Sequence, residues 1–493
     1  MIYNFNLGIG WASSGVEYAQ IYRARMFRNI GVDAKFVFTD MFPSENMEHM
    51  TKNIGFLDSE VIWLYTFFTD FKTAPVTYTL SDLEKTFTEL NYTKTREGKI
   101  CRYVFGGRNN FYTAYMVNDH DDFVHRVELV SNGFLIRKDY FTYGRVYSEY
   151  YAPLDNKAHL YHRRFFNENG SVAYEEIIDD DRVMYKFKDK ILCSKEEFVG
   201  YMVSKLNLTS DDVVLIDRST DIGQSILMNC KPARVGTVVH ADHFSEKDTN
   251  EDYILWNNFY EYEFNMHKHI DFYICSTQAQ SDLMVQQFEK YYGVTPCVYT
   301  IPVGSLPELK YPSSTRKPYS LITASRLASE KHVDWICKAV IQARSEVPEV
   351  SLDIYGVGGE REKLETIIRD NNASDYIHLM GQHDLSEVYQ NYEAYIAGST
   401  SEGFGLTLME AVGGGLPIIG FDVRYGNPTF IRNGENGYLL DLPEEDKDKI
   451  EALRKGIVDL FKQDLEKCHS VSYEVAKDFL TCNVQEKWRE AVC

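Results

Sequence analysis

Two cations and a carboxylate follow an apolar run in the second half of the chain. Arg326, Glu330 and Lys331 come just after residues 319–325, which read as a buried strand. Arg can hold phosphate oxygens through its planar fork, and Lys adds a compact positive charge. Together they could neutralise the negative charge that grows on a departing diphosphate. A solvated loop of mixed charges is the alternative interpretation.

A second cluster joins two carboxylates to a glycine-rich helix start. Residues 399–410 run from the end of a predicted strand into a predicted helix, with Gly403 and Gly405 between Glu402 and Glu410. The free N–H groups of a helix start favour an anion. Glu402 could therefore reach a ligand from the loop, and Glu410, about a turn inside the helix, could reach a ribose or a structural partner. A capping carboxylate and a surface carboxylate are the alternative for this spacing.

Glycines also precede the first predicted helix. Gly8, Gly10 and Gly15 lie between the first predicted strand and a helix predicted for 16–29, where backbone N–H groups could approach an anion. A dinucleotide-binding fingerprint would require glycine where Ser13 stands, which weakens a nicotinamide dehydrogenase as the interpretation. A purely structural tight turn stays open.

Strands and helices alternate on both sides of a proline-rich segment. Four prolines between residues 302 and 318 predict an extended linker. Strands are predicted at 2–6, 34–39, 213–217, 234–240 and 272–276, and others begin near 320, 351, 376, 394, 416 and 437. This rhythm predicts parallel sheets built by right-handed crossovers. The predicted fold class is α/β, with two doubly wound Rossmann-like domains facing a ligand cleft.

Residues 99–192 have a different character. Short runs rich in Tyr, Phe and Val alternate with polar turn clusters, which predicts an antiparallel β-meander. The α/β rhythm resumes afterwards, so the meander is an inserted β-sheet domain. The predicted division is an N-terminal Rossmann-like domain (1–50 and 212–303), the insertion (51–211), a C-terminal Rossmann-like domain (304–475), and a C-terminal helix (476–493) that packs back on the N-terminal domain.

Composition excludes several classes of protein. The 52 Lys and Arg against 73 Asp and Glu give a formal net charge of −21, which disfavours a nucleic-acid partner. Nine cysteines without a Cys-x-x-Cys pair favour a reducing compartment over a disulfide framework or a zinc site. No apolar run approaches the roughly 20 residues that span a membrane. We expect a cytoplasmic protein with at most peripheral association at the inner face of the membrane.

The motifs together resemble the retaining glycosyltransferases of family 4, which have the GT-B fold. The Arg326/Lys331 pair, the Glu402-x7-Glu410 spacing, the glycine-rich helix start and the following Ala411-x-x-x-Gly-x-Pro417 carry this resemblance across the second domain. Segments 7–20, 238–241 and 250–257, with the meander, extend it nearly end to end. There the chain resembles the accessory-Sec transferases that add the first O-linked N-acetylglucosamine to serine-rich-repeat adhesins of Gram-positive bacteria.

The resemblance implies a UDP-sugar bound in the cleft, with UDP-N-acetylglucosamine (UDP-GlcNAc) as donor and UDP-glucose as the alternative. Arg326, Lys331 and Glu402 are the implied catalytic residues. The implied donor-binding residues are Gly15, Val16, Glu17 and Tyr18 near the diphosphate, Glu402, Gly403, Phe404 and Gly405 around the sugar and phosphates, His240 at the sugar, Gln382 and His383 at the uracil, and Glu410 at the ribose. Transfer to Ser or Thr hydroxyls would retain the anomeric configuration.

No convincing metal motif accompanies these residues. Asp-x-Asp pairs at Asp119/Asp121 and Asp179/Asp181 fall in predicted polar turns, where Asp is favoured for its local hydrogen bonds. We therefore predict metal-independent catalysis and no cofactor, the UDP-sugar being a substrate.

The resemblance also implies two macromolecular partners, the adhesin acceptor and a paralogous subunit that stabilises the enzyme and binds the acceptor. The meander, with its tyrosine-rich run 147–151, could dock either partner by strand addition or aromatic contact, unless those rings form its own core. A transferase acting on teichoic acid stays open, although the net charge disfavours a polyanionic acceptor. A non-catalytic acceptor-binding subunit also stays open, although the chain keeps Arg326, Lys331, Glu402 and Glu410 together.

Overall fold

The computed structural model of the protein describes residues 1–9, 15–43, 45–88, 91–106 and 109–493. These form two compact units. Unit 1 comprises residues 1–24, 32–237 and 256–271, and unit 2 comprises residues 25–31, 238–255 and 272–493. Gly10 and Ser13 of the predicted N-terminal turn lie outside the described residues.

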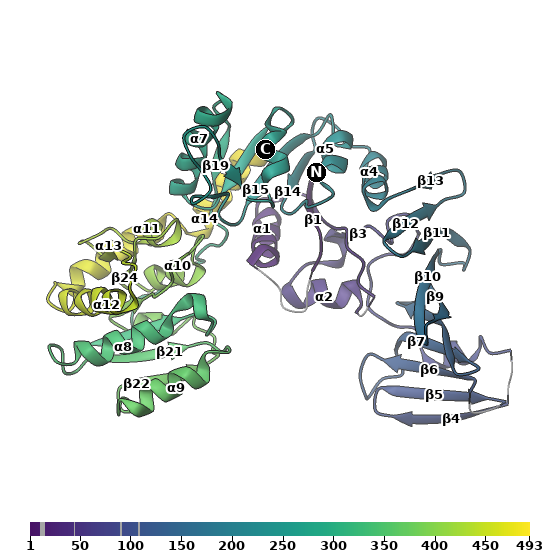
Figure 1. Ribbon diagram of the computed structural model, residues 1–493, viewed down its shortest axis with the longest axis horizontal. Coiled ribbons are helices and arrows are strands. Elements are labelled where there is room, and N and C mark those ends of the chain that lie inside the picture. The colour runs from purple at the N-terminus through teal and green to yellow at the C-terminus, as the bar shows by residue number, and fades with distance from the viewer. Residues whose placement is uncertain (10–14, 44, 89–90, 107–108) are drawn as a thin grey trace. The chain divides into compact units, whose positions relative to one another are not determined.

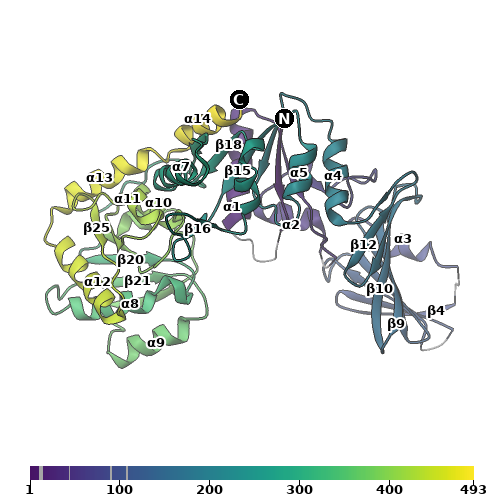
Figure 2. The same ribbon diagram turned by 45° about the horizontal axis from the view of Figure 1, so that its top comes forward.

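Unit 1 contains a parallel sheet with the strand order β15-β14-β1-β2-β3. The strands are β1 (Ile2–Asn6), β2 (Ala34–Phe38), β3 (Val61–Trp63), β14 (Val213–Ile216) and β15 (Arg234–Val239). The helices around it are α1 (Gly15–Ile30), α2 (Met47–Ile54), α4 (Lys195–Lys205), α5 (Gly223–Asn229) and α6 (Glu261–Asn265). Figures 1 and 2 both show α4 beside α5. β3 pairs with β2 although it lies within the predicted insertion 51–211.

The predicted meander is a ten-stranded antiparallel sheet in which each strand pairs with the next along the chain. Its strands are β4 (Tyr92–Glu97), β5 (Ile100–Phe105), β6 (Phe111–Met116), β7 (Val124–Ser131), β8 (Phe134–Phe141), β9 (Arg145–Leu154), β10 (Lys157–Phe166), β11 (Val172–Asp179), β12 (Arg182–Lys186) and β13 (Ile191–Leu192). The short helix α3 (Leu80–Glu84) contributes Leu80 and Leu83 to the core at its β5–β7 end.

The tyrosine-rich run 147–151 is partly core. Tyr147 is 3% exposed and its ring stacks against Tyr140 and Phe165. Tyr150 and Tyr151 are half-buried. The core interpretation is therefore right for Tyr147, because its face of β9 packs against neighbouring aromatic rings.

Unit 2 contains a six-stranded parallel sheet with the order β22-β21-β20-β23-β24-β25. The strands are β20 (Ser320–Ala324), β21 (Ser351–Tyr355), β22 (Ile377–Gly381), β23 (Ala394–Ile396), β24 (Ile418–Phe421) and β25 (Gly437–Leu440). The helices are α8 (Val333–Ala343), α9 (Arg361–Asp370), α10 (Leu406–Gly413), α11 (Gly426–Phe430), α12 (Asp446–Leu460), α13 (Leu465–Lys477) and α14 (Thr481–Val492). β18 (Phe272–Cys275), α7 (Gln278–Tyr292) and β19 (Val298–Thr300) also belong to this unit, and short strands β16 (Phe244–Ser245) and β17 (Leu255–Trp256) precede them.

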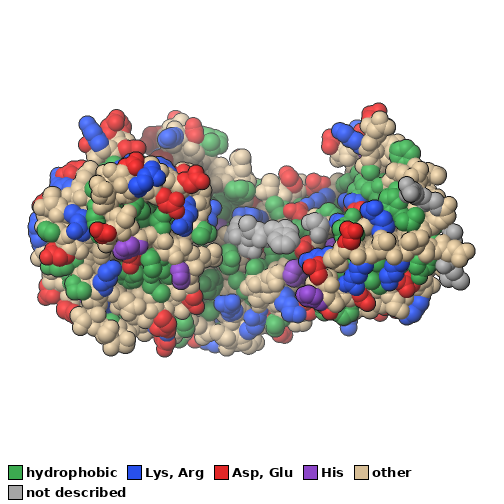
Figure 3. All heavy atoms as spheres, turned by 90° about the horizontal axis from the view of Figure 1, so that it is seen from below, with side chains coloured by type: hydrophobic (Ala, Val, Ile, Leu, Met, Phe, Trp, Pro, Cys, Tyr) green, Lys and Arg blue, Asp and Glu red, His purple; other side chains and the backbone are tan. Residues whose placement is uncertain are grey.

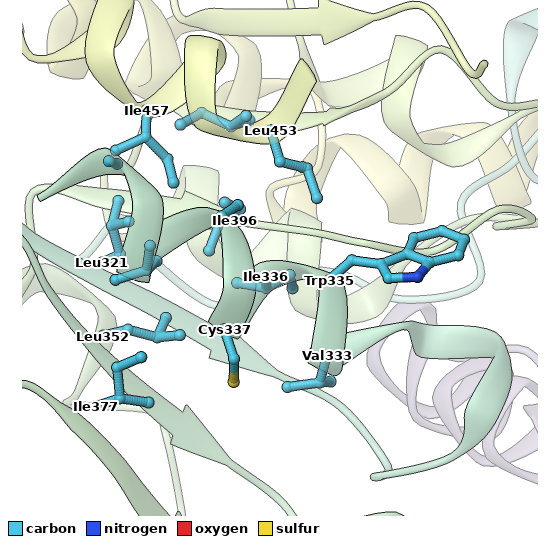
Figure 4. Packing of buried hydrophobic residues seen from close by; sticks show 14 of the residues in the cluster. Leu321, Val333, Trp335, Ile336, Cys337, Leu352, Ile377, Ile396, Leu453 and Ile457 are labelled. Carbon is cyan, nitrogen blue, oxygen red and sulfur yellow. The ribbon is translucent and has the colours of Figure 1, made fainter. Parts of the chain in front are cut away.

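Alternation along the strands divides the core of this sheet into two layers. Leu321, Leu352 and Ile396 face a cluster that includes α8 and α12, while Ile322 and Tyr395 face the cluster that includes α10 and α13. Figure 4 shows Leu321, Leu352 and Ile396 in the first cluster, with Cys337 of α8 and Ile457 of α12. The sheet is thus covered on both faces, as parallel sheets require.

The α/β class and the predicted strands are confirmed, each predicted strand beginning within two residues of the observed start. The four-part domain division, and the cleft between the Rossmann-like domains, stay predictions. Among the described residues, no helix combines the length and apolarity needed to cross a membrane. Figure 3 shows acidic and basic side chains interspersed on the visible surface of each unit, so the net negative charge is not gathered into one patch there.

Candidate functional site

The predicted site residues of unit 2 follow the carboxyl ends of three strands of one parallel sheet, in which β20 and β23 are neighbours and β21 separates β20 from β22. Arg326 and Lys331 follow β20, Gln382 and His383 follow β22, and the loop 399–405 follows β23. Parallel strands end at one edge of their sheet, which is where such sheets bind ligands. The loops after β20 and β21 are joined by backbone bonds, since Ser325 N donates to Tyr355 O over 3.1 Å and Leu327 N to Val357 O over 3.0 Å.

Lys331 and Glu402 meet as an ion pair at this edge. Lys331 Nζ donates to Glu402 Oε2 over 2.7 Å, and both side chains are about one-fifth exposed. Arg326 is different, because its side chain is 79% exposed and pairs with Glu330 over 3.1 Å. Lys331 is therefore tied to a loop that follows another strand, whereas Arg326 is paired only within its own exposed loop. The sequence predicts that both cations follow one strand, β20, but Glu402, the partner of Lys331, follows another strand, β23.

The loop that carries Glu402 is fixed by its backbone. The carbonyl oxygen of Glu402 accepts bonds from Tyr425 N over 2.7 Å and from Gly426 N over 2.8 Å. Gly405, the residue before α10, has φ +87°, which an L-residue rarely adopts. The loop thus turns directly into the helix, whose first N–H groups have no acceptor within the helix. Phe404 is buried in the core beside Phe430 and Phe479.

Glu410 lies one turn inside α10 and has a structural partner. Tyr389 donates its hydroxyl to Glu410 Oε2 over 3.0 Å. Burial raises the pKa of Glu410 above its ordinary value, against the opposing effect of the Tyr389 hydrogen bond. A half-buried carboxylate that accepts the Tyr389 hydroxyl on one oxygen can offer its other oxygen to a ligand hydroxyl. Its predicted contact with a ribose stays a prediction.

Gln382 and His383 form the turn after β22, and their side chains are exposed. The His383 ring lies edge-on to Tyr355, with centroids 5.8 Å apart. A base held at this turn would be bound through backbone groups, as the resemblance implies, and that contact stays a prediction.

His240 directly follows β15. Its carbonyl oxygen lies 3.6 Å from where a Cβ on Gly403 would be, so it adjoins the loop that carries Glu402. Sequence reasoning missed two buried residues near this loop, His243 and Tyr425. His243 contacts Gln287 Oε1 through Nε2 at 2.7 Å and the Tyr425 hydroxyl through Nδ1 at 3.3 Å. Burial lowers the pKa of His243 to about 4. Neither residue belongs to a recognisable motif, so no signal in the sequence pointed to them.

Gly15, Val16, Glu17 and Tyr18 begin α1 in unit 1. Val16 and Glu17 are buried, while Tyr18 is 47% exposed. Their approach to a diphosphate stays a prediction.

A buried ion pair anchors the helix that they begin. Arg23 donates to both carboxylate oxygens of Asp217 over 2.7 and 2.9 Å, and Gln20 donates to the same carboxylate over 2.8 Å. Asp217 directly follows β14, so the pair ties α1 to the end of a neighbouring strand. Sequence reasoning missed this pair, because its members are 194 residues apart.

The two Asp-x-Asp pairs lie in the ten-stranded sheet. Asp119 and Asp121 belong to the connection between β6 and β7. Asp179 is the last residue of β11, and Asp181 lies in the turn before β12. Asp121 accepts a bond from Asn118 Nδ2 over 2.7 Å, which is the local turn bonding predicted for it. Metal independence stays a prediction.

Comparison with known proteins relates both parts of the chain to glycosyltransferases. A family model described as the GtfA extended beta-sheet domain matches residues 93–189, and one described as glycosyl transferases group 1 matches residues 310–478. The first covers most of the ten-stranded sheet, and the second covers the sheet with the Lys331/Glu402 pair.

Full-length relatives extend this result. The GtfA subunit of a UDP-N-acetylglucosamine–peptide N-acetylglucosaminyltransferase from Streptococcus agalactiae is 52% identical over 492 residues, which is 99% of this chain and 97% of that protein. A solved GtfA/B complex contains a chain with a TM-score of 0.96 and 52% identity, covering 100% of this chain and 99% of that one. The pneumococcal O-GlcNAc transferase GtfA, solved with UDP and GlcNAc, has a TM-score of 0.87 and 49% identity, covering 100% and 98%.

Proposed function

We propose that this chain transfers N-acetylglucosamine from UDP-GlcNAc to peptide Ser or Thr hydroxyls. The chain belongs to the family of GtfA subunits of UDP-N-acetylglucosamine–peptide N-acetylglucosaminyltransferases. The observation that carries the proposal is the Lys331–Glu402 pair at 2.7 Å, beside the start of α10 and in a chain related over its full length to these enzymes. UDP-glucose is the alternative donor.

The reaction breaks the bond between the anomeric carbon and the diphosphate oxygen, and it forms a bond from that carbon to the acceptor oxygen. Negative charge accumulates on the departing diphosphate. Lys331, Arg326 and the N–H groups at the start of α10 supply positive charge at the edge where the strands end. The acceptor hydroxyl proton passes to the leaving phosphate, consistent with attack from the same face and retention of configuration.

The remaining donor contacts follow from position. Glu410 would bind the ribose through the carboxylate oxygen that Tyr389 does not occupy. The turn after β22 would hold the uracil through its backbone, and the loop 402–405 with His240 would surround the sugar. Residues 15–18 of unit 1 would complete the site at the diphosphate.

The acceptor and the partner belong to the same proposal. We expect a serine-rich-repeat adhesin, glycosylated before accessory-Sec export, as the acceptor and a GtfB-like subunit as the partner, because a relative 52% identical was solved as a GtfA/B complex. The ten-stranded sheet is the proposed docking surface. Its edge strand β4 is largely exposed and offers unpaired backbone groups for strand addition.

A transfer assay tests this function. The purified chain is incubated with UDP-GlcNAc or UDP-glucose and a serine-rich peptide, with and without a GtfB-like subunit, and the peptide mass is measured. A gain of one N-acetylhexosamine, lost in Lys331→Ala and kept in Lys338→Ala, supports the proposal. Lys338 is a suitable control because it lies on α8 and pairs with Asp334, away from Glu402. A folded chain that binds the peptide but never changes its mass would be a non-catalytic acceptor-binding subunit.

A further inference from the structure

The residue after Lys331 has an unusual backbone conformation. His332 has φ +45° and ψ 42°, in the left-handed region that favours glycine. It ends the short 3-10 turn 329–331 and caps α8, since His332 N donates to Ser329 O over 3.2 Å and Trp335 N to His332 O over 3.0 Å. Strain in a non-glycine residue beside a functional cation points to a constraint imposed by its surroundings.

A stack of side chains supplies that constraint. The His332 ring lies parallel to the Trp335 indole, with centroids 3.6 Å apart and an angle of 4° between the planes. Lys449 of α12 lies over the Trp335 ring, its Nζ 4.7 Å from the centroid. Trp335 is only 4% exposed, and Figure 4 shows its indole extending away from Cys337 and Ile377. The imidazole is therefore held against a fixed surface.

The charge state of the imidazole suits this arrangement. Burial lowers the pKa of His332 below its ordinary value of 6.5, so the ring is neutral at pH 7. Asp334 and Asp446 oppose this shift, while Lys449 and Lys363 add to it. A neutral ring can stack on the indole without burying a charge.

The backbone beside this stack is confined from the other side. Gly398 follows β23, and a Cβ at that position would lie 2.8 Å from His332 O and 3.1 Å from Lys331 O. Only a residue without a side chain lets the turn approach the strand so closely. The strand end that leads to Glu402 thus lies directly against the backbone of Lys331. Small displacements of this turn would move Lys331 Nζ relative to Glu402.

We propose that the His332–Trp335 stack is a positioning device for Lys331. The stack offsets the strain at His332 and holds the turn against Gly398, which keeps Lys331 Nζ pointed at Glu402 and at the donor diphosphate. A preorganised cation stabilises developing charge without reorganising during the reaction. The inference rests on the proposed function, in which Lys331 contacts the diphosphate.

The test compares Trp335→Leu, Trp335→Phe and His332→Gly with a control variant, Phe461→Leu. Phe461 packs against Tyr319, just before β20 and thus at the opposite end of that strand from Lys331. We expect Trp335→Leu and His332→Gly to lower kcat about tenfold or more, with a smaller change in KM for the donor, because misplaced groups cost rate steeply. Trp335→Phe, which keeps a ring under His332, should stay within about threefold of the parent.

A double-mutant cycle separates positioning from general destabilisation. If the stack acts through Lys331, Trp335→Leu should have less than about a twofold further effect on kcat in the Lys331→Ala background. The inference would be overturned if Trp335→Leu lowered kcat as strongly in the Lys331→Ala background as in the wild type. It would also be overturned if His332→Gly left kcat unchanged, or if Trp335→Leu and Phe461→Leu lowered kcat equally.

The same double-mutant cycle can be repeated with the affinity for UDP, measured by calorimetry, in place of kcat. This version tests the positioning role even if the chain shows no transfer. A wild-type chain without transferase activity would refute the proposed function. A failed cycle in an active chain would refute only the positioning role of the stack.

Discussion

Replacing Lys331 by Met should greatly slow transfer while leaving the fold intact. Met keeps the unbranched stem and removes the charge. A positive charge on Lys331 and a negative charge on the diphosphate, about 4 Å apart, would attract each other by about 4 kcal/mol at the effective dielectric constant of about 20 found near protein surfaces. The loss of one donor to a developing oxyanion costs about 100- to 1,000-fold in kcat. We therefore expect kcat to fall by at least about 100-fold.

The effect of the same substitution on stability should be small. The Lys331–Glu402 pair is about one-fifth exposed on both sides, and such pairs contribute at most about 1 kcal/mol. Glu402 keeps water contact after the substitution, so no charge is left fully buried. The urea midpoint of Lys331→Met should therefore lie close to that of the wild type. A large loss of kcat together with a small change in the urea midpoint would identify Lys331 as a functional cation.

The assay measures initial transfer rates over a range of UDP-GlcNAc concentrations, together with urea unfolding followed by circular dichroism. Lys338→Met is the matched control, since Lys338 is 40% exposed and pairs with Asp334 at 3.4 Å on the same helix. It should keep wild-type kcat. A folded Lys331→Met enzyme that retains more than about a tenth of the wild-type kcat would refute the assignment of Lys331 to the leaving diphosphate.

Three further results are expected. Gly405→Ala should destabilise the protein by about 2 kcal/mol in urea unfolding, because φ is +87° and the new Cβ would lie 2.6 Å from Leu408 Cδ1. Gly359→Ala, with open space around it, should change little, and equal effects would contradict this reasoning. Burial raises the pKa of Glu410 above 4.5, so the stability that this carboxyl contributes is full below pH 4.5 and is lost as the pH rises through the raised value. Glu410→Gln should accordingly be more stable than the wild type at pH 7.5 but not at pH 4, and an advantage independent of pH would argue against a titrating Glu410. Transfer should continue in EDTA, whereas activity abolished by EDTA and restored by manganese would show that a metal is required.

Much of the fold was predictable because its signals are local. Most of the parallel strands are short apolar runs bounded by turn residues, and every strand that the sequence predicts begins within two residues of its observed start. The short strands β3 and β19 are not among those predicted. The cations after β20 and the glycine-rich start of α10 are contiguous motifs, so their place at strand ends followed from the strand pattern alone. The resemblance to a glycosyltransferase family rested on these same motifs.

Other features escaped prediction because they join residues that are far apart in the chain. β3 has only three residues, too few for a periodic pattern, and its place at the sheet edge depends on pairing with β2. Lys331 and Glu402 are 71 residues apart, and they meet only because β20 and β23 are neighbours in the sheet.

The sequence by itself determined which segments form strands and helices, and therefore which motifs stand at strand ends, because those signals arise from neighbouring residues. Only the tertiary structure decided which side chains meet. It paired Glu410 with Tyr389, placed His243 beneath Tyr425, and stacked His332 on Trp335 under Lys449 of a distant helix. Such contacts depend on strand order and on the packing of helices across the sheet, which no local pattern specifies.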